Sequence, residues 1–170
     1  MRVGDIIAQG PVTQGIDKDE AIKRARELIS IVGLDSRAFD RFPHEFSGGQ
    51  RQRIGIARSL ALKPEILIAD EPVSALDVSI QAQILELLDE IREQMNLSML
   101  FITHDLRVAA QVCDRLAVMR YGEIVETGAT AELFAKPQHS YTRDLLAAVP
   151  GKKWKAGLKP RSVKSASKSA

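Results

Sequence analysis

Ser47, Gly48 and Gly49 stand where a helix is expected to begin, because a run with helical apolar spacing follows them. A helix N-terminus presents unpaired N–H groups and the positive end of the helix dipole, and the two glycines have no Cβ to block an approaching group. The following Gln50 and its basic neighbours sharpen the pattern. These residues therefore indicate a surface that meets an anion, the alternative being a simple capped helix.

Two carboxylates follow a short apolar run. Asp70 and Glu71 come directly after residues 65–69, a pattern typical of a buried parallel strand that delivers polar groups at its carboxyl end. One carboxylate there can assist a metal ion, and its neighbour can orient or deprotonate a water molecule. His104 follows a second apolar run, residues 98–102, and its imidazole can bond to a phosphate and an attacking water. The alternative for the acids is a pair of solvated strand caps.

The elements between these residues should bring them to one edge. Residues 78–95 carry an apolar stripe at helical spacing, so the order is strand, helix, strand. A crossover of this length favours parallel strands with a right-handed connection, and open α/β sheets bind ligands beyond the carboxyl ends of their strands. We therefore expect Asp70, Glu71 and His104 to emerge at the same edge.

Other patterns predict the remaining elements. Helices are expected at residues 17–32 and 47–62, before Gly33 and Pro64 respectively. After the second strand, we expect a helix near residues 106–112, a hairpin of strands 115–119 and 123–126 through Tyr121-Gly122, and helices near 130–135 and 141–148.

Size and composition favour an ordinary globular protein. The 170 residues are enough for a single compact domain, since domains hold roughly 100–200 residues. No apolar run approaches the roughly 18 residues of a membrane span, and the first residues do not resemble a secretory signal, so we expect the cytosol. Cys113 is the single cysteine, which excludes intrachain disulfides and thiolate clusters.

The C-terminal segment differs in charge. Residues 151–170 hold six lysines and Arg161 without an acid, although the whole chain has a net charge of +2. Their lack of apolar periodicity predicts a solvated, disordered basic tail, whose deletion should not change the melting of the rest. Binding to anionic lipid or nucleic acid is the alternative.

Together these residues resemble a known family. Phe46-Ser47-Gly48-Gly49-Gln50 resembles the signature motif of ATP-binding-cassette (ABC) ATPases, and residues 66–71 resemble their Walker B segment. Ser74-Ala75-Leu76-Asp77 is similar to their D-loop, and His104 to their switch histidine. Residues 134–146 resemble the C-terminal extension of the dipeptide and oligopeptide importer branch. The resemblance covers about residues 1–150.

One expected motif does not occur in the 170 residues: the phosphate loop G-x-x-x-x-G-K-[S/T]. Gly10 and Gly15 have its glycine spacing, but Ile16-Asp17 stands where Lys-Ser/Thr is required, so we interpret that spacing as coincidental. Met1 to Ile7 resembles the segment that follows the family's glutamine loop. The resemblance therefore implies an α/β fold, a truncated P-loop NTPase (ABC ATPase) fold with part of the helical subdomain and parallel core strands.

The resemblance also implies a function and its partners. The chain would be the C-terminal part of an ATP-hydrolysing importer subunit, with ATP and Mg²⁺ as cofactors. Its partners would be a second ABC ATPase subunit and transmembrane permease subunits. Its location would be peripheral, on the cytoplasmic face of the membrane. The implied site residues are Glu71 and His104 for catalysis, Asp70 for the metal, and Ser47, Gly48, Gly49, Gln50, Ser74 and Asp77 for nucleotide binding.

The implied divisions are residues 1–62 as helical subdomain, 63–128 as catalytic core, 129–150 as importer extension and 151–170 as tail. Without a phosphate loop, the isolated chain should be deficient in hydrolysis. The alternative is a non-enzymatic partner or an inert fragment. An ABC-type ATPase acting on nucleic acid or the ribosome is a third hypothesis; the importer-like extension argues against it, and we expect no specific nucleic-acid partner.

Overall fold

The computed structural model describes residues 1–149, which form two compact units. The first unit is Met1–Ile102 and the second begins at Thr103. The expectation of a single compact domain was therefore wrong. The reason is that the hairpin and helices after Thr103 pack on one another, so this segment has long-range contacts of its own. Among residues 1–149, no helix combines the length and apolarity that crossing a membrane requires.

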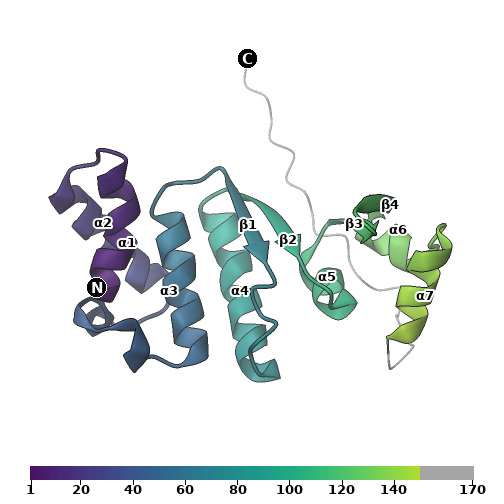
Figure 1. Ribbon diagram of the computed structural model, residues 1–170, viewed down its shortest axis with the longest axis horizontal. Helices are drawn as coiled ribbons and strands as arrows, with labels where there is room; N and C mark the ends of the chain where they lie inside the picture. The colour runs from purple at the N-terminus through teal and green to yellow at the C-terminus, as the bar shows by residue number, and fades with distance from the viewer. Residues whose placement is uncertain (150–170) are drawn as a thin grey trace, which may run out of the picture. The chain divides into compact units, whose positions relative to one another are not determined.

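Helices form the N-terminal part of the first unit (Figure 1). α1 (Val3–Thr13) and α2 (Lys18–Ile31) pack against each other and against α3 (Gly48–Leu60), and the short 3-10 helix η1 (Ser36–Asp40) packs on α1 and α2. The side chains of Val3, Ile7, Ile29 and Leu60 are almost completely buried between them. A second short 3-10 helix, η2 (Pro43–Glu45), precedes α3 in the chain.

α1 was not predicted, because Gly10 and Pro11 lie inside it. Both residues disfavour helix interiors, but Pro11 is in the last turn and tertiary burial of Val3 and Ile7 outweighs local propensity. A helix also excludes a phosphate loop at Gly10, which agrees with our interpretation of its spacing to Gly15 as coincidental.

The predicted helices α2 and α3 are confirmed, and each begins at a capping side chain. The Asp17 side chain accepts hydrogen bonds from the N–H groups of Asp19 and Glu20 at 2.9 and 3.2 Å, which satisfies two amides at the start of α2. Ser47 caps α3 in the same way. The cap at Ser47 therefore places Gly48 and Gly49 in the first turn of α3.

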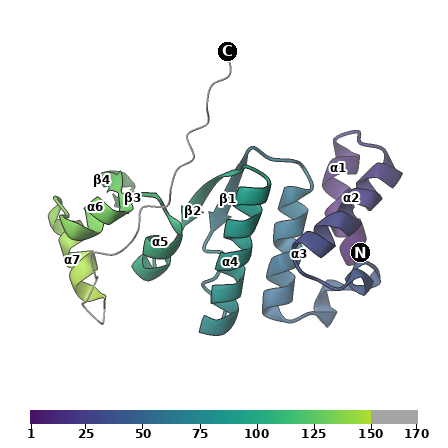
Figure 2. The ribbon, with the colours of Figure 1, turned by 180° about the vertical axis from the view of Figure 1, so that it is seen from behind.

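A parallel strand pair follows, as predicted. β1 (Ile66–Asp70) pairs with β2 (Ser98–Ile102), and α4 (Val78–Gln94) connects them. α4 runs alongside the strands in both views (Figures 1 and 2). Its stripe of Ile84, Leu88 and Ile91 is buried. The strand order and the register, which pairs Asp70 with Ile102, place the carboxyl ends of both strands at one edge.

The sheet has one covered and one uncovered face. Leu67 and Ala69 on β1 are buried, whereas their neighbours Ile66 and Ile68 are 62% and 64% exposed. On β2, Leu100 pairs with Ile68 and Ile102 pairs with Asp70, and both residues of β2 are also exposed. Both strands are apolar on both faces, a pattern from which we expected exposed apolar surface in this chain, and within residues 1–102 only one face is covered.

The second unit contains α5 (Leu106–Val112), β3 (Arg115–Arg120), β4 (Glu123–Ala129), α6 (Thr130–Ala135) and α7 (Ser140–Ala148). β3 and β4 form the predicted antiparallel hairpin, with Tyr121 and Gly122 at positive φ in its turn. The Thr130 hydroxyl donates to the Cys113 carbonyl at 2.6 Å, which ties the start of α6 to the end of α5. The predicted tail, residues 151–170, lies outside the described residues.

Candidate functional site

Ser47 and Gln50 cap the first turn of α3 reciprocally. The Ser47 N–H donates to Gln50 Oε1 at 3.0 Å, and the Gln50 N–H donates to Ser47 Oγ at 3.4 Å. This capping box holds the turn in one conformation while Ser47, Gly48 and Gln50 stay exposed. The predicted anion-facing residues thus form an ordered, solvent-accessible helix N-terminus, and the remaining first-turn N–H groups are available to a ligand.

The two glycines of this turn contact different residues. A Cβ at Gly48 would lie 3.7 Å from the Leu76 side chain, an ordinary van der Waals distance. A Cβ at Gly49 would lie 2.5 Å from Ile80 Cγ2, far inside van der Waals contact. The first turn of α3 therefore packs against the loop before α4 and against the first turn of α4.

Asp70 and Glu71 lie at the carboxyl end of β1. Asp70 is the last residue of the strand and is exposed. Glu71 is also exposed, and its φ of 44° is in the left-handed region, which only a few per cent of residues other than glycine adopt. The Glu71 N–H donates to the Ile102 carbonyl at 2.9 Å, so β2 holds this backbone in place.

Ser74 and Asp77 order the loop that leads from Glu71 to α4. The Ser74 hydroxyl donates to the Glu71 carbonyl at 3.1 Å. Asp77 Oδ1 accepts from the Ser79 N–H at 3.1 Å, the Ser79 hydroxyl at 2.8 Å and the Ile80 N–H at 3.0 Å. The Ile80 N–H and then the Ser79 hydroxyl hold the pKa of the Asp77 carboxyl below its ordinary value. Both side chains are thus engaged in local structure.

His104 lies in the turn between β2 and α5. It is exposed and belongs to the unit that begins at Thr103. Next to it, the Asp105 N–H donates to Thr103 Oγ1 at 3.1 Å, and Asp105 Oδ1 caps α5 through the Arg107 N–H at 2.8 Å. Asp70 and Glu71 belong to the other unit, so the meeting of His104 with these carboxylates stays a prediction.

The carboxylates at the end of β1 are exposed oxygen donors, the kind of ligand that Mg²⁺ prefers. Within residues 1–149, no group of three or more His, Cys, Asp or Glu side chains is arranged to hold a metal ion. Mg²⁺ in nucleotide sites usually takes one or two carboxylates and completes its shell with phosphate oxygens and water. The exposed carboxylate of Asp70 fits that kind of site.

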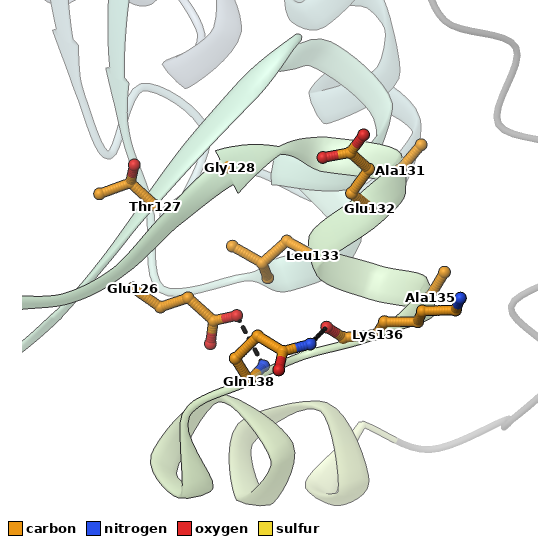
Figure 3. A pocket seen from close by; sticks show the side chains of 9 residues that line it. All are labelled: Glu126, Thr127, Gly128, Ala131, Glu132, Leu133, Ala135, Lys136 and Gln138. Atoms are coloured by element: carbon orange, nitrogen blue, oxygen red, sulfur yellow. Dashed lines mark hydrogen bonds between the residues drawn. The ribbon is translucent and has the colours of Figure 1, made fainter.

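A groove of about 560 Å³ lies in the second unit, between β4 and α6 (Figure 3). One of its walls contains Glu126, whose carboxylate accepts from the N–H groups of Gln138 and His139 at 2.8 and 3.1 Å. The groove contains none of the predicted site residues.

Sequence reasoning missed two features of the site. The side chain of Gln50 completes the cap, which the Ser-x-x-Gln spacing could have revealed. The packing of Ile80 on Gly49 joins residues 31 positions apart in sequence, and no local pattern indicates it.

Comparison with known proteins decides the family. Residues 3–74 match the sequence profile described as "ABC transporter". The chain is 52% identical over 151 residues to a putative peptide import ATP-binding protein of Brucella ovis. The aligned residues are 88% of this chain and 48% of that protein. It is 51% identical over 152 residues to the oligopeptide transport ATP-binding protein of Bacillus subtilis, covering 88% and 50% respectively. The chain belongs to the ABC transporter family.

Solved structures agree with this ABC family membership. An inward-facing putative metal-chelate type ABC transporter superposes with a TM-score of 0.75 at 26% identity, over 88% of this chain and 59% of that one. CbiO1 of Clostridium perfringens, part of the cbiONQ transporter complex, gives 0.71 at 29%, over 88% and 58%. The fold is therefore part of the ABC ATPase fold, with the predicted parallel core strands. The chain spans about half the length of the curated relatives that it matches.

Proposed function

We propose that this chain contributes the signature motif and the catalytic carboxylate and histidine to the ATP-binding and hydrolysing subunit of an importer for peptides or related small solutes. The observation that carries the proposal is the sequence identity of 51–52%, along 88% of the chain, to peptide, dipeptide and oligopeptide transport ATP-binding proteins. ATP and Mg²⁺ are the cofactors.

The geometry of the first unit supports the roles of its residues. The exposed N-terminus of α3, with Ser47 and Gly48 at its tip, suits contact with the terminal phosphate of an ATP held by a second ABC ATPase subunit. Asp70 suits the nucleotide's Mg²⁺, and Glu71 suits the attacking water. In this proposal Ser74 and Asp77 order the loop beside the signature turn, and His104 contacts the transferred phosphate.

In the proposed assembly the chain has partner subunits and a defined place at the membrane. Two ATPase subunits would sandwich ATP and act on transmembrane permease subunits, which places the protein peripherally on the cytoplasmic face of the membrane. Residues 1–62 would form the helical subdomain, 63–128 the catalytic core and 129–150 the importer extension.

A second candidate follows from the missing sequence G-x-x-x-x-G-K-[S/T]. The amides and lysine of that loop supply the main contacts to the β- and γ-phosphates. We therefore propose that the isolated 170-residue polypeptide binds and hydrolyses ATP weakly. As such it would be a non-enzymatic partner that offers its signature turn to nucleotide on an intact subunit, or an inert fragment.

An association experiment with an intact subunit separates the two candidate functions. The 170-residue chain is mixed with an intact peptide-import relative, and ATP-dependent association is measured by size-exclusion chromatography. We expect Ser47→Arg to abolish the association, because the long side chain occupies the α3 terminus that must meet the phosphate. Ser59→Arg, an exposed serine later in the same helix, is the matched control and should associate normally. Equal association of both variants would reject the role of the signature turn, and no association of the parent chain would favour the inert fragment.

A further inference from the structure

The two glycines of the signature turn differ in the space around them. At Gly48 a methyl group would meet its nearest neighbour, Leu76 Cδ2, at 3.7 Å, so the protein has room for alanine there. At Gly49 the methyl would meet Ile80 Cγ2 at 2.5 Å, a separation that non-bonded carbon atoms do not reach. Packing inside the chain thus excludes a side chain at Gly49 and permits a small one at Gly48.

Ile80 cannot easily yield to a larger neighbour. It is β-branched and lies in the first turn of α4, where one χ1 rotamer dominates, so the position of Cγ2 follows the helix backbone. That backbone is fixed by Asp77, whose Oδ1 accepts the Ile80 N–H at 3.0 Å. The methyl group is therefore a rigid support rather than the flexible end of a long side chain.

Gly55 provides an internal comparison. It lies in α3 like Gly49, but a Cβ there would have nothing within 4 Å, apart from the helix's own backbone. Replacement by alanine at this position should only favour the helix. The steric restriction thus belongs to the contact with Ile80 and not to helix α3 in general.

We propose that Ile80 is a positioning residue for the signature turn. Its Cγ2 methyl group packs on the Gly49 backbone and fixes the first turn of α3 against the first turn of α4. Ser47 is thereby held at a constant position relative to the loop that ends at Asp77. This inference rests on the proposed function for its effect on ATP-dependent association, but the contact itself is independent of any ligand.

The competing explanation is that Gly49 is a glycine because ATP must approach its backbone. The two explanations differ in what restores a Gly49→Ala variant. If the clash with Ile80 causes the damage, then removing Cγ2 restores the turn. If the ligand requires the space, no substitution at position 80 restores it.

The experiment uses three substitutions at Ile80, each with and without Gly49→Ala, in the 170-residue chain. Ile80→Leu and Ile80→Ala both remove Cγ2, and the leucine variant keeps the volume. Ile80→Val keeps Cγ2 and is the matched control. The first readout, without nucleotide, is hydrogen exchange of the Arg51 amide, which donates to the Ser47 carbonyl at 2.9 Å. The second is ATP-dependent association with the intact relative, and Gly55→Ala is the background control.

Gly49→Ala alone should accelerate Arg51 exchange by about fivefold to about a hundredfold, the range that overpacking produces, and weaken association. Adding Ile80→Leu or Ile80→Ala should return exchange to within about twofold of the corresponding single variant and restore association. Adding Ile80→Val should restore neither. Gly55→Ala should exchange and associate like the parent.

Two results would overturn the proposal. Equal acceleration by Gly49→Ala in every Ile80 background would mean that the two residues are not coupled. Restored exchange without restored association, in a pair whose parent associates, would assign Gly49 to ligand approach. If the parent pair does not associate while the exchange coupling is present, the proposed function fails and the positioning contact stands.

Discussion

The Glu71 N–H donates to the Ile102 carbonyl at 2.9 Å, one residue beyond the last registered pair of β1 and β2. The parallel ladder thus extends into the residue proposed to act on water. Glu71 needs that support because its φ of 44° is unfavourable for a residue with a Cβ. A strained backbone held by a neighbouring strand fixes the direction in which the chain leaves the sheet, towards Ser74 and Asp77.

Glu71→Gln should separate binding from hydrolysis. The amide keeps the shape of the side chain and removes the carboxylate, so nucleotide affinity should persist while turnover falls by roughly two to four decades. The measurement is ATP affinity beside steady-state hydrolysis, in this chain fused behind the phosphate-loop segment of a peptide-import relative. Glu86→Gln, an exposed glutamate on α4, is the control. Parental turnover in Glu71→Gln would reject Glu71 as the base.

His104→Ala should resemble Glu71→Gln in the same fusion. Loss of one group that contacts the transition-state phosphate typically lowers turnover about 10²- to 10³-fold and leaves ground-state binding nearly unchanged. His44→Ala, which removes another exposed imidazole, should hydrolyse ATP at the parental rate. A fall in nucleotide affinity as large as the fall in turnover would instead assign His104 to ground-state binding.

The exposed sheet face should bind hydrophobic dyes. Ile68 and Leu100 are paired neighbours on this face and are 64% and 54% exposed. Replacing both with serine should reduce dye fluorescence and aggregation and change the free energy of unfolding by only about 0.5 kcal/mol for each site. Leu67→Ala, on the covered face of β1, should cost about 2–5 kcal/mol. A large loss of stability in the serine variant would show that this face is covered in solution.

Asp77 should make stability depend on acid pH. Its folded pKa lies below the ordinary value of 3.8, because the ionised carboxylate accepts hydrogen bonds from Ile80 and Ser79. The resulting stabilisation is complete well above pH 3.8 and is lost as the pH falls through the lower folded pKa. Asp77→Asn keeps an acceptor oxygen but does not titrate, so its unfolding midpoint in urea should fall less than the parent's as the pH is lowered from about 5 through the folded pKa of Asp77. Identical pH profiles would contradict this assignment.

Much of the local structure could be predicted because its signals lie close together in sequence. The Ser47 cap and the Tyr121-Gly122 turn act over two to four residues, β1 and β2 follow from short apolar runs, and α4 follows from an apolar stripe at helical spacing. The motifs at Ser47, Asp70 and Ser74 also carried the family resemblance, which the comparison with peptide import proteins confirmed.

Only the tertiary structure decided the rest, because those features depend on residues far apart in the chain. Burial of Val3 and Ile7 by other helices forms α1 despite Pro11, and packing after Thr103 creates a second compact unit. Exposed apolar surface on the strands could be expected from their sequence, but only the tertiary structure shows which face is covered, since an apolar strand specifies that it should be buried but not by what. The close approach of Gly49 to Ile80 is of the same kind: the sequence determines that position 49 has no side chain, and the packing of two helices determines why.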